Sequence, residues 1–280
     1  MPVIATNTSA NSALTYLNRN SEDQAKSLSK LSSGSRIVVA SDDAAGLAVA
    51  NGLQADITTL QQGARNALQG RAVMQTADGA LSRVGDILQR MKSLASQALS
   101  GSVDDTGRGF IQQEYDQLLT EIGDIATQTE FNGTTLLDGA SFNESFLVGV
   151  NSGDTIDVDL TTATGDDINV TAIAGTLTAG TSLTTDTATT QGEMDAVDAA
   201  IDDISAARAT VGSYISRFEY RGEYIETAME NLSAAKSSIM DVDIAAEQTN
   251  LVNKQVLTEA SIAALAQANQ SKSSLLSLLR

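Results

Sequence analysis

Few residues of this chain are of the types that carry out catalysis. Its 280 residues include no histidine and no cysteine, which removes the most common general base, the most common transition-metal ligands and every thiol nucleophile. A Ser-His-Asp or Cys-His arrangement is therefore impossible. Catalysis by carboxylates or a lysine stays open in principle, but the sequence predicts no enzyme, no catalytic residue and no cofactor.

Three carboxylates, Asp154, Asp157 and Asp159, are the clearest candidates for a metal site, because Ca²⁺ prefers carboxylate oxygens. Asp157 and Asp159, however, alternate along an expected strand, and no loop supplies a glycine and ligands at the spacing of a calcium loop. We therefore interpret these residues, and Asp166 with Asp167, as a solvated face.

The charge of the chain limits its partners. It has 35 acidic and 17 basic residues, a net charge of −18, which argues against nucleic acid and anionic lipid. No Lys or Arg lies between Arg108 and Arg208, so we expect the acidic middle to face water. The N-terminus lacks the pattern of a cleavable secretory signal, and no apolar run approaches the ~20 residues that span a bilayer.

The elements that hold these residues are mainly helices. The single proline is Pro2, so long helices are permitted elsewhere. Residues 32–36 break a first helix, and Ser41 begins a second helix that runs to Ala98. Steps of three and four predict a coiled-coil seam in the first helix through Ala10, Leu14, Leu17, Ser21, Gln24, Leu28 and Leu31.

A shorter helix with Ile111, Tyr115 and Ile122 on one stripe follows the turn-rich connector 100–109 and should pack back on the second helix. Strand-like segments 146–150 and 155–160 flank Asn151–Asp154, which predicts a hairpin. Residues 161–192, with the strand-like INVTAI at 168–173, are either a small exposed β-lobe or a flexible loop, and the sequence leaves both open.

The C-terminal part returns to helix. Thirteen positions from Val197 to Ile239 alternate steps of four and three, which predicts a coiled coil. Residues 251–280 are apolar on more than one stripe and must be buried, so we expect them to pack on the N-terminal helix and on copies of the chain. The predicted fold class is mainly α, an elongated rod of long N- and C-terminal helices in coiled-coil packing, with a small β-rich lobe or hairpins in the middle.

Five segments in order resemble bacterial flagellin. They are SLSKLSSGSRI at 27–37, ASDDAAGLAVA at 40–50, TEFNGTTLLDG at 129–139, FLVGVNSGDTI at 146–156 and LAQANQSKSSLLSLLR at 265–280. The resemblance covers roughly residues 1–160 and 190–280. It implies a subunit that self-assembles through its terminal helices into the flagellar filament for swimming motility. It also implies export through the flagellar type III apparatus and an extracellular location in the flagellum.

The resemblance divides the chain into five parts. Residues 1–40 and 241–280 correspond to the inner filament core, 41–160 and 193–240 to the outer core, and 161–192 to a short variable surface-exposed insert. Threonines of the insert are candidates for O-glycosylation or simply belong to a soluble loop (Thr161, Thr162, Thr184, Thr185, Thr189 and Thr190). The expected polymerisation seam consists of Leu14, Leu17, Leu28, Leu31, Leu251, Val252, Leu257, Ile262, Leu265, Leu276 and Leu279.

The resemblance also implies partners. These are the chain itself as a helical homopolymer, an export chaperone at about residues 241–280, the filament cap and the hook-filament junction proteins. A host Toll-like receptor patch is implied at Gln89, Arg90 and Leu94, with Glu114 from the neighbouring helix. Ser93 and Lys92 depart from the family's usual acid and arginine. An equal alternative for Arg90 and Leu94 is ordinary helix packing.

Two other classes remain as alternatives. A hook-filament junction protein shares the terminal helices, although the segment 129–139 and the LLSLLR ending favour a filament subunit. A secreted coiled-coil structural protein of another kind is the second. Some flagellins carry a metalloprotease in the insert, but a chain without histidine cannot hold its His-Glu-x-x-His motif.

Overall fold

The structure is a computed structural model of the 280-residue chain. It describes all residues except 1–5, 140–141, 161–168, 179–182, 184–186 and 279–280. The chain forms two compact units, one of Met1–Ile57 with Glu230–Arg280 and the other of Thr58–Met229. Each unit is described by itself.

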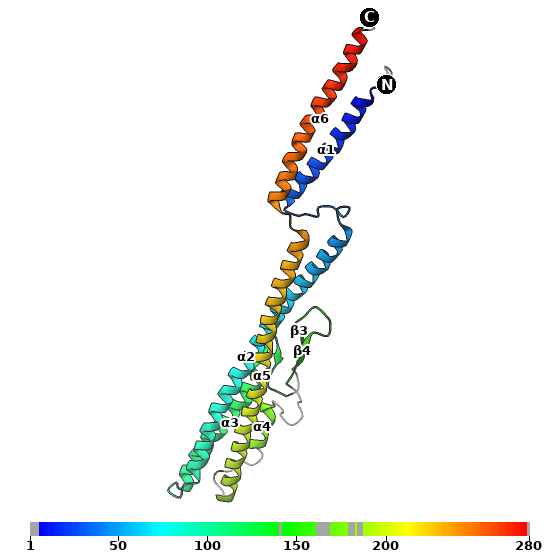
Figure 1. The fold of residues 1–280 in the computed structure, drawn as a ribbon. Helices are drawn as coiled ribbons and strands as arrows, with labels where there is room; N and C mark the ends of the chain where they lie inside the picture. Colours follow the sequence, from blue (N-terminus) through cyan, green and yellow to red (C-terminus); the bar gives the residue numbers. More distant parts are fainter. Residues whose placement is uncertain (1–5, 140–141, 161–168, 179–182, 184–186, 279–280) are drawn as a thin grey trace. The chain divides into compact units, whose positions relative to one another are not determined.

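The first unit brings the two ends of the chain together. Helix α1 (Thr8–Ser33) and helix α6 (Ile244–Leu278) lie side by side (Figure 1). Asn7 caps α1 by accepting a hydrogen bond from the Ala10 N–H, and Gly34 ends the helix at a φ of 72°, a left-handed conformation that glycine adopts without strain. The Val242 N–H donates to the Gly34 carbonyl at 3.1 Å, which ties the two interhelical connectors together. The expected pairing of the terminal helices is confirmed.

The second unit is built on α2 (Ala44–Ala98) and α5 (Thr187–Met240), two helices that also contribute to the first unit. Their apolar stripes form its core, which includes Met74, Leu81, Leu88, Val197, Ile204, Val211 and Phe218. Helix α2 runs without a break through Gly70. The absence of a side chain at Gly70 makes room for the Phe218 ring, because a Cβ there would lie 2.5 Å from ring carbons of Phe218.

Helix α3 (Asp105–Gln128) follows the connector after α2 and packs on the same unit. Asp104 is its N-cap and accepts a hydrogen bond from the Gly107 N–H at 2.9 Å. Ile111, Tyr115 and Ile122 are buried, as their spacing predicts.

The strands form two small antiparallel hairpins. β1 (Glu130–Phe131) and β2 (Thr134–Thr135) are joined by Asn132 and Gly133, both with positive φ. β3 (Asn143–Leu147) pairs with β4 (Thr155–Asp159), with Phe146 opposite Ile156. The predicted hairpin around Asn151–Asp154 is confirmed, but the first strand ends at Leu147 rather than Val150, because Val148 already bonds back to the Asp154 carbonyl at 2.9 Å.

One segment of the predicted insert corrects the sequence interpretation. The described part of the strand-like 168–173 stretch enters a helix, α4 (Val170–Thr178), which packs on α3. Its buried residues Val170, Ala174 and Leu177 are spaced by four and three, a helical period that a six-residue window does not separate from alternation. Thr161, Thr162, Thr184 and Thr185 lie outside the described residues. Of the other two candidate threonines, Thr189 is exposed and Thr190 is buried.

The fold class is therefore mainly α. Long terminal helices pack together, and small strand hairpins lie in the middle of the chain.

Candidate interaction surfaces

The contact between α1 and α6 is largely polar. The Asn7 side chain donates to the Ala268 carbonyl at 3.2 Å, and that of Asn20 donates to the Ser261 hydroxyl at 3.4 Å. The Lys254 ammonium lies 2.7 Å from the Asp23 carboxylate, and this hydrogen bond lowers the pKa of Asp23. A polar contact of this kind sets the alignment of the two helices but buries little apolar surface.

Large apolar side chains on the same two helices remain exposed. Leu14, Tyr16 and Leu28 are exposed on α1. Exposed apolar residues on α6 are Ile244, Val252, Val256, Leu257 and Ile262. A helix that is apolar on several sides needs a further partner to cover it.

The residues of the expected polymerisation seam fall into three groups. Leu251 is buried, and Leu17, Leu31 and Leu265 are partly buried. The exposed members are Leu14, Leu28, Val252, Leu257 and Ile262. The side chains of Leu276 and Leu279 lie outside the described part of the chain. The seam therefore combines residues near the α1–α6 contact with residues that face away from it.

The expected receptor patch is brought together only in part. Arg90 of α2 donates from Nε and Nη2 to one carboxylate oxygen of Glu114 on α3, at 2.8 and 2.6 Å. Gln89 and Arg90 are exposed, whereas Leu94 is only 2% exposed and lies in the core of the unit. The alternative of ordinary helix packing fits the position of Leu94.

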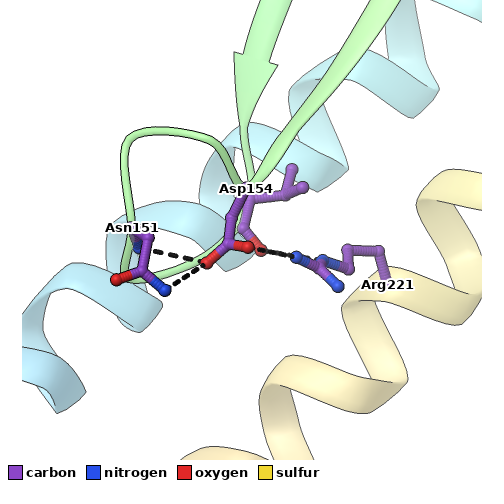
Figure 2. Close-up of polar contacts among 4 residues, drawn as sticks. Asn151, Asp154 and Arg221 are labelled. Atoms are coloured by element: carbon purple, nitrogen blue, oxygen red, sulfur yellow. Dashed lines mark hydrogen bonds and ion pairs between the residues drawn. The ribbon is translucent and has the colours of Figure 1, made fainter.

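The β3–β4 turn is anchored to two helices, α2 and α5. Asp154 accepts hydrogen bonds from the Asn151 backbone N–H at 3.0 Å and from its side chain at 3.2 Å (Figure 2). Arg221 of α5 donates to the Val148 carbonyl at 3.1 Å and lies 3.5 Å from Asp154. The Asn151 backbone N–H, and after it Arg221, lower the pKa of the Asp154 carboxyl.

These contacts give Asp154 a structural role in the turn. Asp157, the next candidate, accepts a hydrogen bond from the Ser145 hydroxyl across the hairpin. Among the residues that the structure describes, no group of three acidic side chains is placed to hold a metal ion.

A buried acid on α5 escaped the sequence analysis. Glu193 is only 4% exposed and lies near the buried Tyr115 of α3. Burial raises the pKa of Glu193, and burial followed by the charge of Glu193 raises the pKa of Tyr115. A signal existed, because Glu193 precedes the first heptad position, Val197, by four residues and so continues the core stripe.

The terminal helices of this chain are long, pair through polar contacts and expose apolar faces. These features are typical of coiled-coil structural proteins. Comparison with known proteins identifies the family of this chain within that class. The model of the bacterial flagellin N-terminal helical region matches residues 4–141, and that of the C-terminal helical region matches residues 194–279. The chain belongs to the bacterial flagellin family.

Individual relatives agree with the family models. A flagellin of Halalkalibacterium halodurans is 40% identical over 255 residues, which cover 91% of each chain. A flagellin of Bacillus subtilis is 35% identical, with 98% of each chain covered. The crystal structure of Bacillus cereus flagellin is 31% identical and superposes with a TM-score of 0.50 over 61% of this chain and 94% of its own.

These findings make the chain a structural protein, a self-assembling subunit of the bacterial flagellar filament. The filament implies a place in the extracellular flagellum. The alternative of a hook-filament junction protein is not favoured by these relatives. Within the described residues, no helix combines the length and apolarity needed to cross a membrane.

Proposed function

We propose that this flagellin polymerises by burying the exposed apolar faces of α1 and α6 against other copies. The observation that carries the proposal is that polar and apolar residues of these helices face different partners. Polar residues such as Asn20 and Asp23 bind the partner helix within the chain, while Leu28, Leu257 and Ile262 remain in water. The proposed surface includes five residues of the seam that the sequence predicts, Leu14, Leu28, Val252, Leu257 and Ile262.

The magnitude of the driving force supports this use. Eight large apolar side chains are exposed on α1 and α6, each by 43–65%. Full burial of such a side chain contributes about 1.5–3 kcal/mol, so covering the exposed half of each contributes roughly 1 kcal/mol. The gross gain of about 8 kcal/mol per subunit is comparable with the cost of association of about 4–15 kcal/mol. Assembly therefore needs several contacts per subunit, as a helical lattice provides.

The proposal extends to the organisation of the filament. Residues 1–40 and 241–280 would form its inner core, residues 41–160 and 193–240 its outer core, and residues 161–192 its surface. The charge distribution supports this arrangement, because the cation-free stretch between Arg108 and Arg208 contains the insert and a charged surface prefers water.

Partners before and after assembly follow from the same surfaces. An export chaperone would cover α6 in the cytoplasm, because the exposed Val256 and Leu257 of α6 favour aggregation of a free subunit. Export would proceed through the flagellar type III apparatus, with the cap at the growing tip and junction proteins at the hook. A Toll-like receptor would read the exposed Arg90–Glu114 pair with Gln89.

Electron microscopy after salt-induced polymerisation tests the proposed surface. A variant with Val256→Ser, Leu257→Ser and Ile262→Ser should stay helical by circular dichroism and fail to form filaments. A matched control, Glu259→Gln, changes an exposed residue of the same helix and should polymerise. A chain truncated after Met240 should also fail, and filaments formed by either defective variant would refute the proposed surface.

A further inference from the structure

Helices α2 and α5 leave a pocket between them within the second unit. Its volume is about 380 Å³, within the range of about 300–1,000 Å³ that is usual for sites that bind small molecules. Small residues make this space, because Ala64 and Ala67 line the pocket from α2 and Gly222 lines it from α5. A Cβ added at Gly222 would meet no atom within 4 Å, so the pocket is open at this point.

The floor of the pocket is apolar. Phe218 lies at its base and is 1% exposed, whereas the side chain of Leu68 is 57% exposed. Covering exposed apolar surface with the hydrocarbon part of a ligand is favourable in water. The floor therefore favours a ligand that carries methylene or methyl groups.

The rim of the pocket is acidic. Glu219, Glu223 and Glu226 line it at steps of four and three along α5, which places them on one face of the helix. A rise of 1.5 Å per residue separates them by about 6 and about 4.5 Å along the helix axis. Because like charges at this spacing repel one another, the rim favours a ligand that carries positive charge.

Only one acid of the rim has a basic partner. Arg71 of α2 lies 3.6 Å from Glu219. Arg65, the next basic residue toward the N-terminus of α2, instead donates two hydrogen bonds to the side chain of Gln62 on its own helix. Among the residues that the structure describes, neither of the other two carboxylates of the rim forms an ion pair.

The register of the two helices explains why these two carboxylates are unpaired. Helices α2 and α5 run antiparallel, so a step back along α2 from Arg71 matches a step forward along α5 from its partner. Steps of four and seven residues place Ala67 and Ala64 across from Glu223 and Glu226, and all four residues line the pocket. Two negative charges therefore lie beside an apolar floor without a cation.

We propose that this pocket binds a linear aliphatic polyamine, whose ammonium groups pair with Glu223 and Glu226 and whose methylene chain covers Leu68. Spacers of roughly three or four methylene groups place successive nitrogens about one helical turn apart, close to the spacing of the two carboxylates. Such a ligand matches both the rim and the floor, whereas an inorganic cation matches the rim alone. Binding does not require polymerisation, so the inference goes beyond the proposed function.

NMR titration of the monomer with spermidine tests the inference. Spermidine should shift the methyl signals of Ala64, Ala67 and Leu68 to saturation. The net charge of −18 attracts any polycation to the chain, so Mg²⁺ at the same ionic strength measures this general attraction. Mg²⁺ should bind at least about tenfold more weakly than spermidine, because it cannot cover the apolar floor.

Two variants separate the charge of the site from its shape. Glu223→Gln combined with Glu226→Gln should raise the Kd for spermidine about tenfold, the factor expected for the loss of two exposed ion pairs. Gly222→Leu keeps both charges and fills the pocket, so it should raise the Kd by at least as much. Circular dichroism should show both variants as helical as wild type, since leucine and glutamine favour helix.

Two matched controls lie elsewhere on α5. Gly212→Leu adds the same side chain at another glycine whose Cβ would meet no atom within 4 Å. Asp202→Asn combined with Asp203→Asn removes two exposed charges from the same helix. Both controls should bind spermidine as wild type does, because they lie outside the pocket.

Three results would overturn the inference. Spermidine and Mg²⁺ could bind with equal affinity, or the aspartate control could lose as much affinity as the glutamate variant, and either result would show that spermidine follows net charge alone. Unchanged affinity in a folded Gly222→Leu variant would show that the pocket is not the site. If Gly222→Leu fails to fold, the comparison between the glutamate variant and the aspartate control still decides.

Discussion

Replacing Gly70 by alanine separates helix propensity from packing in the second unit. In the interior of α2, a change from glycine to alanine should stabilise the helix by about 1 kcal/mol. At Gly70 the new Cβ would lie 2.5 Å from two ring carbons of Phe218. The ring must therefore retreat by about one ångström to restore an ordinary carbon–carbon contact of about 3.5 Å.

The surroundings of Phe218 resist that retreat. The residue is 1% exposed, and its ring meets Phe146 edge-on with centroids 5.4 Å apart. Inserting a methyl group into a packed core typically costs about 1–3 kcal/mol. Gly70→Ala should therefore destabilise the protein by about 0–2 kcal/mol once the propensity gain is subtracted.

Gly79 provides the matched control on the same helix. A Cβ at Gly79 meets no atom within 4 Å, so Gly79→Ala should show the propensity gain alone, about 1 kcal/mol. Urea unfolding of the monomer, followed by circular dichroism, measures both variants. A double-mutant cycle of Gly70→Ala with Phe218→Leu should give a coupling energy of about 1 kcal/mol or more. Equal stabilisation by the two alanine variants, or additivity in the cycle, would refute the packing argument.

Three further predictions concern other parts of the second unit. Burial raises the folded-state pKa of Glu193 above 4.5, so protonation of Glu193 favours the folded state, and this contribution to stability is lost as pH rises through the folded pKa. In urea unfolding experiments at a series of pH values, Glu193→Gln should remove this decrease in stability. An unchanged dependence of stability on pH would contradict the prediction. Leu94→Ala should lower the free energy of unfolding by about 2–5 kcal/mol, because Leu94 is in the core. Arg90→Ala should lower it by at most about 1 kcal/mol, because the Arg90–Glu114 pair is exposed. Only the Arg90 variant therefore tests receptor contact without a large loss of stability. Gly133→Ala, at a φ of 81°, should lower the melting temperature through backbone strain, and an unchanged temperature would argue against strain in that turn.

Sequence periodicity predicted most of the helices, because α2, α3 and α5 each keep one stripe apolar over many turns. The hairpin around Asn151–Asp154 was also predictable, since a short polar turn between two strand-like segments permits few other structures. Helix α4 was not. Its nine residues are too few for periodicity to distinguish helix from strand, and its packing against α3 decides the outcome.

The Arg90–Glu114 patch and the Arg221 anchor of the β3–β4 turn are two sites that local sequence pattern does not predict. Arg90 and Leu94 lie one helical turn apart and suggest a common surface, but α3 and α5 pack around α2 in such a way that one side chain is exposed and the other buried. The Arg221 anchor joins residues about seventy positions apart, and no spacing within either segment predicts it.

By itself, the sequence determined the composition-based exclusions, the long helices and the family to which the chain belongs, because these depend on residue types and local order. Tertiary structure alone decided which side of α1 meets α6, since the apolar residues of both helices occupy several stripes and periodicity does not choose among them. Pairing through Asn20, Asp23 and Lys254 settles that choice by hydrogen bonding and charge. It leaves Leu28, Leu257 and Ile262 exposed, and burial of those side chains is what association with further copies can supply.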